Sequence, residues 1–131
     1  MAITRVEEIG ETWLSLRTLL NLCYPRPPQN VCDLLETLYR DGFPAWLAEE
    51  EGELVGFVCL FPNSKGGTLE TLAVSPFCQR RGVGGELVDA LLKETTGVVS
   101  LTTRIPLYFD KFGFREVDRL ADGSIFMFRK C

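Results

Sequence analysis

The sequence predicts a mixed α/β fold, in which a central, mostly antiparallel sheet of about six to seven strands carries about four helices on its two faces. Three observations predict it. The chain has 131 residues, which suits one domain over residues 1–131, because a domain typically takes roughly 100 to 200 residues. Its composition, 46% hydrophobic and 24% charged, is that of an ordinary globular protein. Helix and strand patterns follow the order two helices, two strands, two strand–helix units and a hairpin.

The amino-terminal third carries two predicted helices. A short apolar segment, Ala2–Val6, precedes them and could form a strand. Apolar residues recur at helical intervals over Glu7–Leu22, and the prolines of the segment YPRPP end that helix. A second helix is expected from about Gln29 to Tyr39, and Gly42 and Pro44 end it.

The middle of the chain predicts a hairpin of two strands, Ala45–Glu49 and Leu54–Phe61. The second strand is apolar on both faces, so we expect it at the centre of the sheet. The acidic run Glu49–Glu51 with Glu53 is expected to be a solvated turn. Beside an acceptor groove, such a turn could instead attract a cationic amine.

The carboxyl-terminal half supplies the remaining elements. They are a strand over Thr68–Val74, a helix with apolar residues from Val83 to Leu92, a strand over Val98–Thr102, a short helix over Leu107–Phe112, and a hairpin from Phe114–Val117 to Ser124–Phe128 with its turn at Asp122 and Gly123.

The charges and the hydropathy exclude several classes of partner. The formal net charge of −4 offers no positive field for a polyanion, so we expect no nucleic-acid partner. No apolar run approaches the roughly 18 residues of a membrane helix, and the start MAITRVEEIGE lacks the features of a secretion signal. We therefore expect a cytoplasmic protein without a membrane partner. The sequence leaves the oligomeric state open, a homodimer included.

The residue types limit the chemistry. The chain has no histidine, which removes the commonest general base and metal ligand. Its five cysteines are odd in number and form no CxxC pair, so neither a disulfide framework nor a metal site is expected. Catalysis would have to rely on carboxylates, tyrosine, lysine or backbone groups.

A strand followed by glycines and arginines predicts an anion site at Val74–Gly85, which reads VSPFCQRRGVGG. Glycines let backbone N–H groups approach an oxyanion closely, and the free N–H groups of the following helix complete the site. Arg80 and Arg81 add positive charge. The segment lacks the Lys and Ser/Thr of a P-loop and the spacing of GxGxxG, so ATP and NAD are poor candidates.

The segment LAVSPFCQRRGVGGELV resembles the acyl-CoA signature of the GCN5-related N-acetyltransferase (GNAT) superfamily, whose core is (Q/R)xxGx(G/A). The preceding strand, Pro76, the following helix and the Gly113–Phe114 pair also match the family's context. The resemblance implies the GNAT fold and an enzyme that transfers an acetyl group from acetyl-coenzyme A (acetyl-CoA) to a primary amine of a small molecule or amino acid. Transfer would be direct, within a ternary complex, and without a metal.

The resemblance also implies a cofactor site. Backbone groups of the strand end would bind the pantetheine arm, and N–H groups from Arg80 through Gly85 would hold the pyrophosphate. The implied cofactor-binding residues are Leu72, Ala73, Val74, Gln79, Arg80, Arg81, Gly82, Val83, Gly84 and Gly85.

Two catalytic roles follow from the chemistry of acetyl transfer. An amine acceptor has a pKa near 10.4 if it resembles lysine, or about 8 if it is an α-amine, and must lose a proton before it attacks. Glu70 stands where the family often carries a carboxylate and is the candidate base. The alternative is that Glu70 is a solvated or salt-bridged strand residue without a catalytic role. The oxyanion could be stabilised by the N–H of Val74 at the bulged end of the strand.

The candidate general acid departs from the family's pattern. The family often places a tyrosine four residues before the glycine of the GF pair, where this chain has Phe109 with Tyr108 one residue earlier. One residue is about 100° of helix rotation, so the hydroxyl could face elsewhere. The candidates for protonating the thiolate are therefore Tyr108, a water, or no donor at all.

A shorter likeness concerns the acceptor. The segment LTTRIPLYFDKFGF is similar to a stretch of the N-acetylglutamate synthase branch, which favours a small amine or amino acid. Arg104 could then meet a carboxylate or a CoA phosphate, or be a plain surface residue. Two other functions stay open: a non-catalytic acyl-CoA-binding regulatory module, and an acetyltransferase that acts on a protein amine. Without histidine, a covalent intermediate on Cys78 is not expected.

Overall fold

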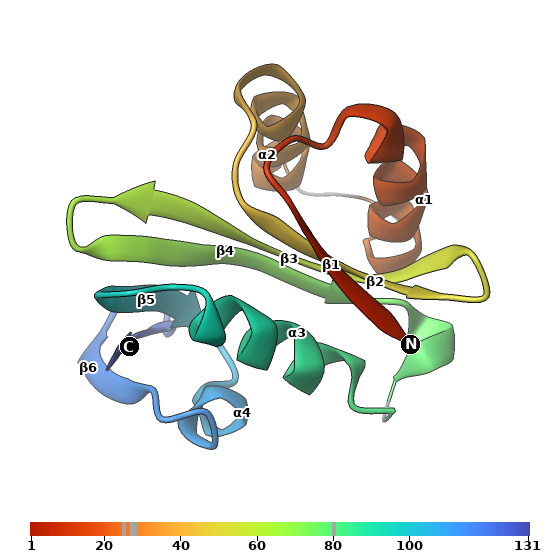
Figure 1. Ribbon diagram of the computed structural model, residues 1–131. Helices are drawn as coiled ribbons and strands as arrows, with labels where there is room; N and C mark the ends of the chain where they lie inside the picture. Colours follow the sequence, from red (N-terminus) through yellow and green to blue (C-terminus); the bar gives the residue numbers. More distant parts are fainter. Residues whose placement is uncertain (25, 27–28, 80) are drawn as a thin grey trace.

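The computed structural model describes residues 1–24, 26, 29–79 and 81–131. Its elements are β1 (Ala2–Val6), α1 (Trp13–Cys23), α2 (Gln29–Asp41), β2 (Ala45–Glu50), β3 (Glu53–Asn63), β4 (Gly66–Val74), α3 (Val83–Lys93), β5 (Val98–Thr103), α4 (Pro106–Asp110), β6 (Arg115–Arg119) and β7 (Ile125–Lys130), with single 3₁₀ turns η1 (Gly10–Thr12) and η2 (Pro76–Cys78). Helices α1 and α2 cover one face of the sheet, and α3 and α4 lie on the other (Figure 1).

All seven strands of the described residues form one sheet in the order β1-β2-β3-β4-β5-β7-β6. Every neighbouring pair is antiparallel except β4 and β5, which are parallel. The predicted fold class, a mostly antiparallel mixed sheet with helices on both faces, is therefore confirmed.

Some element boundaries differ from the prediction. The first helix begins at Trp13 rather than Glu7, because Gly10 has a φ of +45° and Gly10–Thr12 forms only a 3₁₀ turn. Helix α4 ends at Asp110, two residues before the predicted end at Phe112. Strand β7 continues to Lys130, two residues beyond the predicted end at Phe128. Residues 25, 27 and 28 of the predicted helix-ending YPRPP segment lie outside the described residues.

Two hydrophobic cores lie on the two faces of the sheet, and β3 contributes to both. Phe57 and Cys59 face the core under α1 and α2, whereas Val58 and Leu60 face the core under α3 and α4. All four side chains are buried. This alternation confirms that the strand apolar on both faces lies at the centre of the sheet.

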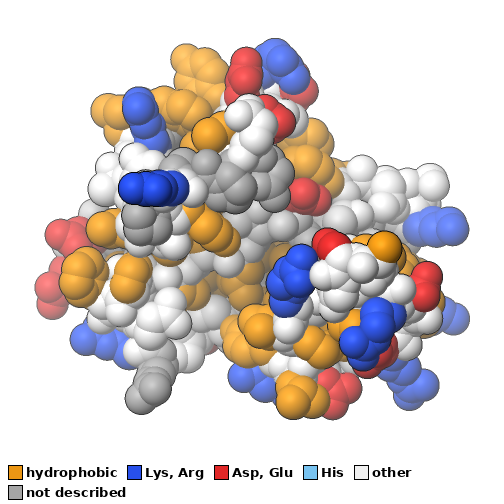
Figure 2. All heavy atoms as spheres, turned by 180° about the vertical axis from the view of Figure 1, so that it is seen from behind, with side chains coloured by type: hydrophobic (Ala, Val, Ile, Leu, Met, Phe, Trp, Pro, Cys, Tyr) orange, Lys and Arg blue, Asp and Glu red, His pale blue; other side chains and the backbone are white. Residues whose placement is uncertain are grey.

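The surface carries interspersed charges. Figure 2 shows acidic and basic side chains side by side over the rear face, as expected of a chain with a small net charge. In the part of the chain that the structure describes, no helix is long and apolar enough to cross a bilayer.

The start of α3 is held against the sheet at Gly56 of β3. A Cβ built on Gly56 would lie 2.7 Å from Val83 Cγ1 and 2.8 Å from Leu87 Cδ1. Both side chains belong to the first turns of α3 and are buried. The absent side chain at Gly56 therefore sets how closely the helix start approaches the sheet.

We expect Gly56→Ala to lower the free energy of unfolding by about 1–3 kcal/mol, because the added methyl overpacks a filled core. Urea denaturation followed by circular dichroism measures it. Without a clash, the same change would stabilise the protein by about 0.4–1 kcal/mol through the unfolded state. A stabilised variant would thus contradict the close approach of α3 to β3.

Candidate active site

A gap opens between β4 and β5. The two strands pair only where Gly66–Thr68 meets Val98–Ser100, and both then continue without pairing with each other. Beyond Thr68, β4 therefore has β3 as its strand neighbour on one side and the gap on the other. Main-chain groups that point away from β3 in this stretch face the gap.

Alternate residues of β4 turn their backbone toward this gap. The Ser75 N–H donates to the Val55 carbonyl oxygen at 2.8 Å, in register with the pairing of β3 and β4. Because hydrogen-bonded and non-hydrogen-bonded pairs alternate in an antiparallel ladder, Ala73 also directs its backbone toward β3. Leu72 and Val74 direct theirs into the gap. Of the three strand residues predicted to offer backbone groups, these two are placed to do so.

A β-bulge places Glu70. Thr71 pairs with Cys59 and Leu69 pairs with Leu60, so Glu70 has no residue opposite it on β3. Bulges re-aim side chains and are frequent beside active sites. The bulge was predicted at the Val74 end of the strand, whereas it lies four residues earlier, at the candidate base Glu70.

Two cavities meet at the gap. A cavity of about 460 Å³ lies beside α3 and α4. Its lining residues are Leu72, Val74, Cys78, Gln79, Gly82, Val83, Gly84, Gly85, Ile105, Tyr108 and Lys111. A cavity of about 320 Å³ is lined by Tyr24, Val31, Leu69, Glu70, Thr71, Leu72, Leu101, Thr102, Thr103, Arg104, Ile105 and Phe109. The two share Leu72 and Ile105.

The first turn of α3 forms one wall of the larger cavity, which we call the helix-side cavity. Gly82 precedes the helix with a φ of +79°, a left-handed conformation that favours glycine. The first helical hydrogen bond runs from the Glu86 N–H to the Gly82 carbonyl oxygen at 3.0 Å, so the N–H groups before Glu86 have no partner within the helix. These N–H groups and the helix dipole suit an anion.

The comparisons with known proteins agree with this geometry. Residues 13–114 match the sequence profile of the Acetyltransferase (GNAT) family. The chain belongs to this family. Aminoglycoside 6'-N-acetyltransferase complexed with coenzyme A shares 21% identity with a TM-score of 0.80, over 99% of this chain and 97% of that chain. The aminoglycoside 6'-N-acetyltransferase from Enterococcus faecium shares 20% identity with a TM-score of 0.81, over the same shares.

A third structure is similar to this GNAT chain in fold. Escherichia coli ElaA has 19% identity and a TM-score of 0.78, with 99% of this chain and all 100% of that chain covered. At these identities the solved structures show the fold alone. Among proteins with curated descriptions, none matches the sequence.

Within this GNAT fold, the carbonyl of Val74 already has two donors. Gln79 Nε2 lies 3.0 Å and Cys23 Sγ 3.3 Å from the Val74 carbonyl oxygen. Gln79, a predicted cofactor-binding residue, thus lines the helix-side cavity and ties the loop to the strand end. Burial raises the pKa of the Cys23 thiol. Because both donors contact the carbonyl oxygen of Val74, its N–H is the gap-facing backbone group that they do not occupy.

Arg81 points away from the helix-side cavity. Its Nη1 lies 3.2 Å from Glu50 Oε2, at the end of β2. Glu50 is half-buried, so this member of the acidic run is not the solvated residue expected, while Glu49, Glu51 and Glu53 are exposed. The guanidinium therefore anchors the loop to β2. Arg80, predicted beside it, lies outside the described residues.

Of the three remaining candidate side chains, Glu70 and Arg104 line one cavity and Tyr108 lines the other. Glu70 is exposed and lines the smaller, strand-side cavity, whereas Tyr108 is half-buried and lines the helix-side cavity. Burial and the nearby charge of Asp89 raise the pKa of Tyr108. Arg104 lines the strand-side cavity and donates to Asp122, at 3.1 Å to its carbonyl oxygen and 3.4 Å to Oδ2.

Sequence reasoning missed Lys111 and Ile105. The Lys111 ammonium lies 4.3 Å from the centre of the Tyr108 ring and lines the helix-side cavity. Its position three residues after Tyr108 on a short helix was the signal that could have found it. Ile105 follows β5 directly, and no sequence signal marked it, because its role depends on where the strands separate.

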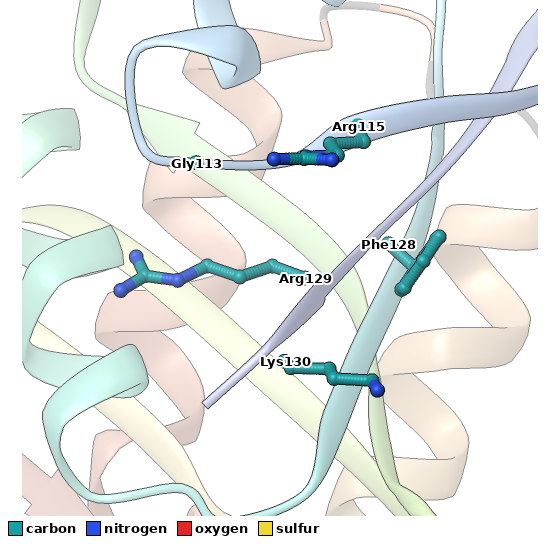
Figure 3. A pocket seen from close by; sticks show the side chains of 5 residues that line it. All are labelled: Gly113, Arg115, Phe128, Arg129 and Lys130. Carbon is teal, nitrogen blue, oxygen red and sulfur yellow. The ribbon is translucent and has the colours of Figure 1, made fainter.

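A third cavity, of about 420 Å³, lies at β6 and β7, the strands at one edge of the sheet, and is lined mainly by basic residues (Figure 3). Arg115, Arg129 and Lys130 surround it together with Gly113 and Phe128. Arg129 Nη1 donates to the Phe112 carbonyl oxygen at 2.5 Å, just after α4. This guanidinium thus satisfies a carbonyl at the end of a helix, a structural role.

We expect Gly82→Val to raise the dissociation constant for CoA by at least about tenfold, since a β-branched residue at positive φ would displace the N–H groups of the loop. Gly52→Val is the matched control: Gly52 has a φ of +81°, and neither glycine has a neighbour within 4 Å of a built Cβ. Isothermal titration calorimetry with CoA measures both variants. Equal affinity of the Gly82 variant and the parent would contradict the anion site.

Proposed function

We propose that the chain transfers an acetyl group from acetyl-CoA to a primary amine of a small molecule or amino acid, directly within a ternary complex. One observation carries this proposal: cavities on either side of the gap meet at Leu72 and Ile105. A thioester in the helix-side cavity and an amine in the strand-side cavity would meet where β4 and β5 separate. Because both substrates would meet at this one place, direct transfer is favoured over transfer through a covalent acyl intermediate on the protein.

The cofactor would lie against β4 as an added strand. The gap-facing groups of Leu72 and the N–H of Val74 would bind the pantetheine arm, and the first turn of α3 would hold the pyrophosphate. Lys111, at the same cavity, would add a cation near the phosphates. Support comes from the GNAT relative whose structure contains coenzyme A.

The transfer itself follows from these placements. Glu70 would accept a proton from the ammonium form of the acceptor, directly or through water, and release it to solvent. The amine lone pair would form the C–N bond, and the C–S electron pair would leave on sulfur as the CoA thiolate. The nitrogen, positively charged after the attack, would then lose its second proton to Glu70 or water, which leaves the neutral amide. A gap-facing N–H of β4, that of Val74 or Leu72, would stabilise the oxyanion in between.

The strand-side cavity favours a small acceptor. Its volume of about 320 Å³ lies at the lower end of the range typical of ligand sites. The Glu70 carboxylate would attract an ammonium group. Arg104 keeps N–H groups beyond those bonded to Asp122, and these would suit an acceptor carboxylate, as the short likeness to the N-acetylglutamate synthase branch suggests.

We also propose that residues 1–131 act as one domain in the cytoplasm. Both cores use the same sheet, and α1, α3 and β4 all contribute to one site, so a division of the chain would split the core. All five cysteines are free thiols, which suits a reducing compartment.

A second candidate is a non-catalytic acyl-CoA-binding module. Phe109 favours it, because this residue stands where the family often has a tyrosine and is buried in the core beside Phe114, 5.9 Å between ring centres. Such a module would bind acetyl-CoA without turnover.

We expect one member of a primary-amine panel to gain about 42 Da, one acetyl group, when incubated with acetyl-CoA and the protein, with release of free CoA thiol. Glu70→Gln should lower this rate by about 100-fold or more, since it removes the general base. Glu49→Gln, an exposed residue of β2 outside both cavities, should keep the parent rate.

The two candidate functions give different results. Binding of acetyl-CoA without thiol release on any small amine or peptide amine would support the non-catalytic module. Acetylation of peptide amines alone would identify a protein acceptor. Equal rates for Glu70→Gln and the parent would remove Glu70 from the mechanism.

A further inference from the structure

The hydroxyl of Tyr108 lies at the first turn of α3. A Cβ built on Gly84 would lie 2.6 Å from the Tyr108 hydroxyl oxygen and 3.5 Å from Val74 Cγ2. Both Tyr108 and Gly84 line the helix-side cavity, and neither lines the strand-side cavity. The hydroxyl is therefore close to the first turn of α3, whose N–H groups have no partner within the helix and suit an anion.

This position is distant from the place where the two substrates would meet. The cavities join at Leu72 and Ile105. Val74, the β4 residue near the hydroxyl, lies two residues beyond Leu72, which is about 7 Å along a strand. A donor for the leaving sulfur would need hydrogen-bond contact with it, within about 3.2 Å. The Tyr108 hydroxyl lies nearer the pyrophosphate end of the cofactor's path.

The surrounding groups hold the ring in this position. Phe109 and Phe112 contact it with ring centres 5.1 and 5.5 Å away, and the Lys111 ammonium lies over one face at 4.3 Å. Burial raises the pKa of Tyr108, so at neutral pH the phenol keeps its proton as a hydrogen-bond donor. Transfer of that proton to a thiolate with a cysteine-like pKa near 8.5 would be uphill.

We propose that Tyr108 is a cofactor-binding residue whose hydroxyl donates to a CoA oxygen at the first turn of α3, and that it does not protonate the leaving thiolate. The proposal rests on the proposed function. When the C–S bond breaks, the sulfur keeps the electron pair and takes its proton from solvent water. Of the two protons that the acceptor nitrogen loses on becoming an amide, one neutralises the hydroxide formed and the other is released to solvent.

Calorimetric titration with CoA tests the contact. We expect Tyr108→Phe to raise the dissociation constant by about three- to thirtyfold, the cost of one hydrogen bond to an acceptor oxygen. Tyr24→Phe is the matched control, since Tyr24 is also half-buried but lines only the strand-side cavity. It should bind CoA like the parent. An unchanged constant for Tyr108→Phe would overturn the proposal.

Gly84→Ala tests where the hydroxyl lies. The new methyl would push the tyrosine hydroxyl aside, so this variant should weaken CoA binding as Tyr108→Phe does. In the double variant Gly84→Ala/Tyr108→Phe the clashing atom is gone, and the nearest remaining atoms lie at 3.5 and 3.8 Å, in ordinary contact. The double variant should therefore bind like Tyr108→Phe alone. If the loss of CoA affinity in the double variant equals the sum of the losses in the two single variants, the close approach of the Tyr108 hydroxyl to Gly84 is contradicted.

Kinetics separates binding from proton donation. With saturating acetyl-CoA and the amine that the panel identifies, kcat of Tyr108→Phe should stay within about twofold of the parent, with the same pH profile. A general acid contributes about 10²- to 10⁴-fold, so a loss of that size with unchanged CoA affinity would show that Tyr108 is the acid. Failure of the parent itself to bind CoA would instead overturn the proposed function.

Discussion

The separation of β4 from β5 after three residue pairs is the constraint on which the site depends. Backbone N–H and C=O groups that lose a strand partner must find another, in the protein, in water or in a ligand. The Val74 carbonyl accepts from Gln79 and Cys23, while Leu72, whose backbone groups face the gap, lines both cavities. The same opening therefore leaves an edge of β4 without a strand partner, next to both cavities.

A second constraint is the close approach of α3 to this edge. Glycine at position 56 lets the helix start sit directly on β3, and glycine at position 84 leaves room for the Tyr108 hydroxyl. The positive end of the helix dipole, with the N–H groups that have no partner within the helix, then borders the helix-side cavity. A chain with a net charge of −4 can in this way present a local site for an anion, because the attraction comes from oriented backbone dipoles within the first turn.

The charged side chains near this site are mostly committed to the protein itself. Arg81 pairs with Glu50, Arg104 with Asp122, and Arg129 with a carbonyl at the end of α4. These pairs hold the loop after β4, the start of α4 and the last strand in place. Among the described residues, Lys111, stacked on Tyr108, is the cationic side chain that lines the helix-side cavity. These three arginines, among the described residues, are thus bonded within the protein itself.

Local patterns predicted the elements well and their ends less well. The LAV strand, its glycine-rich turn and the apolar face of α3 follow from neighbouring residues, so they were predictable. The start of α1 was not, because the left-handed Gly10 interrupts an apolar spacing that continues through it. The sequence could not distinguish Glu50 from its acidic neighbours, because what sets it apart is the ion pair with Arg81, which is distant in the sequence.

The sequence by itself determined the strand–turn–helix unit, the order of the elements and the absence of imidazole chemistry, because these depend on composition and on contacts a few residues apart. Only the tertiary structure decided that Tyr108, and not Phe109, lines the helix-side cavity, that the bulge lies at Glu70, and that Leu72 and Ile105 line both cavities. Those features arise where strands distant in the sequence pair and then separate, and no local pattern records the point of separation.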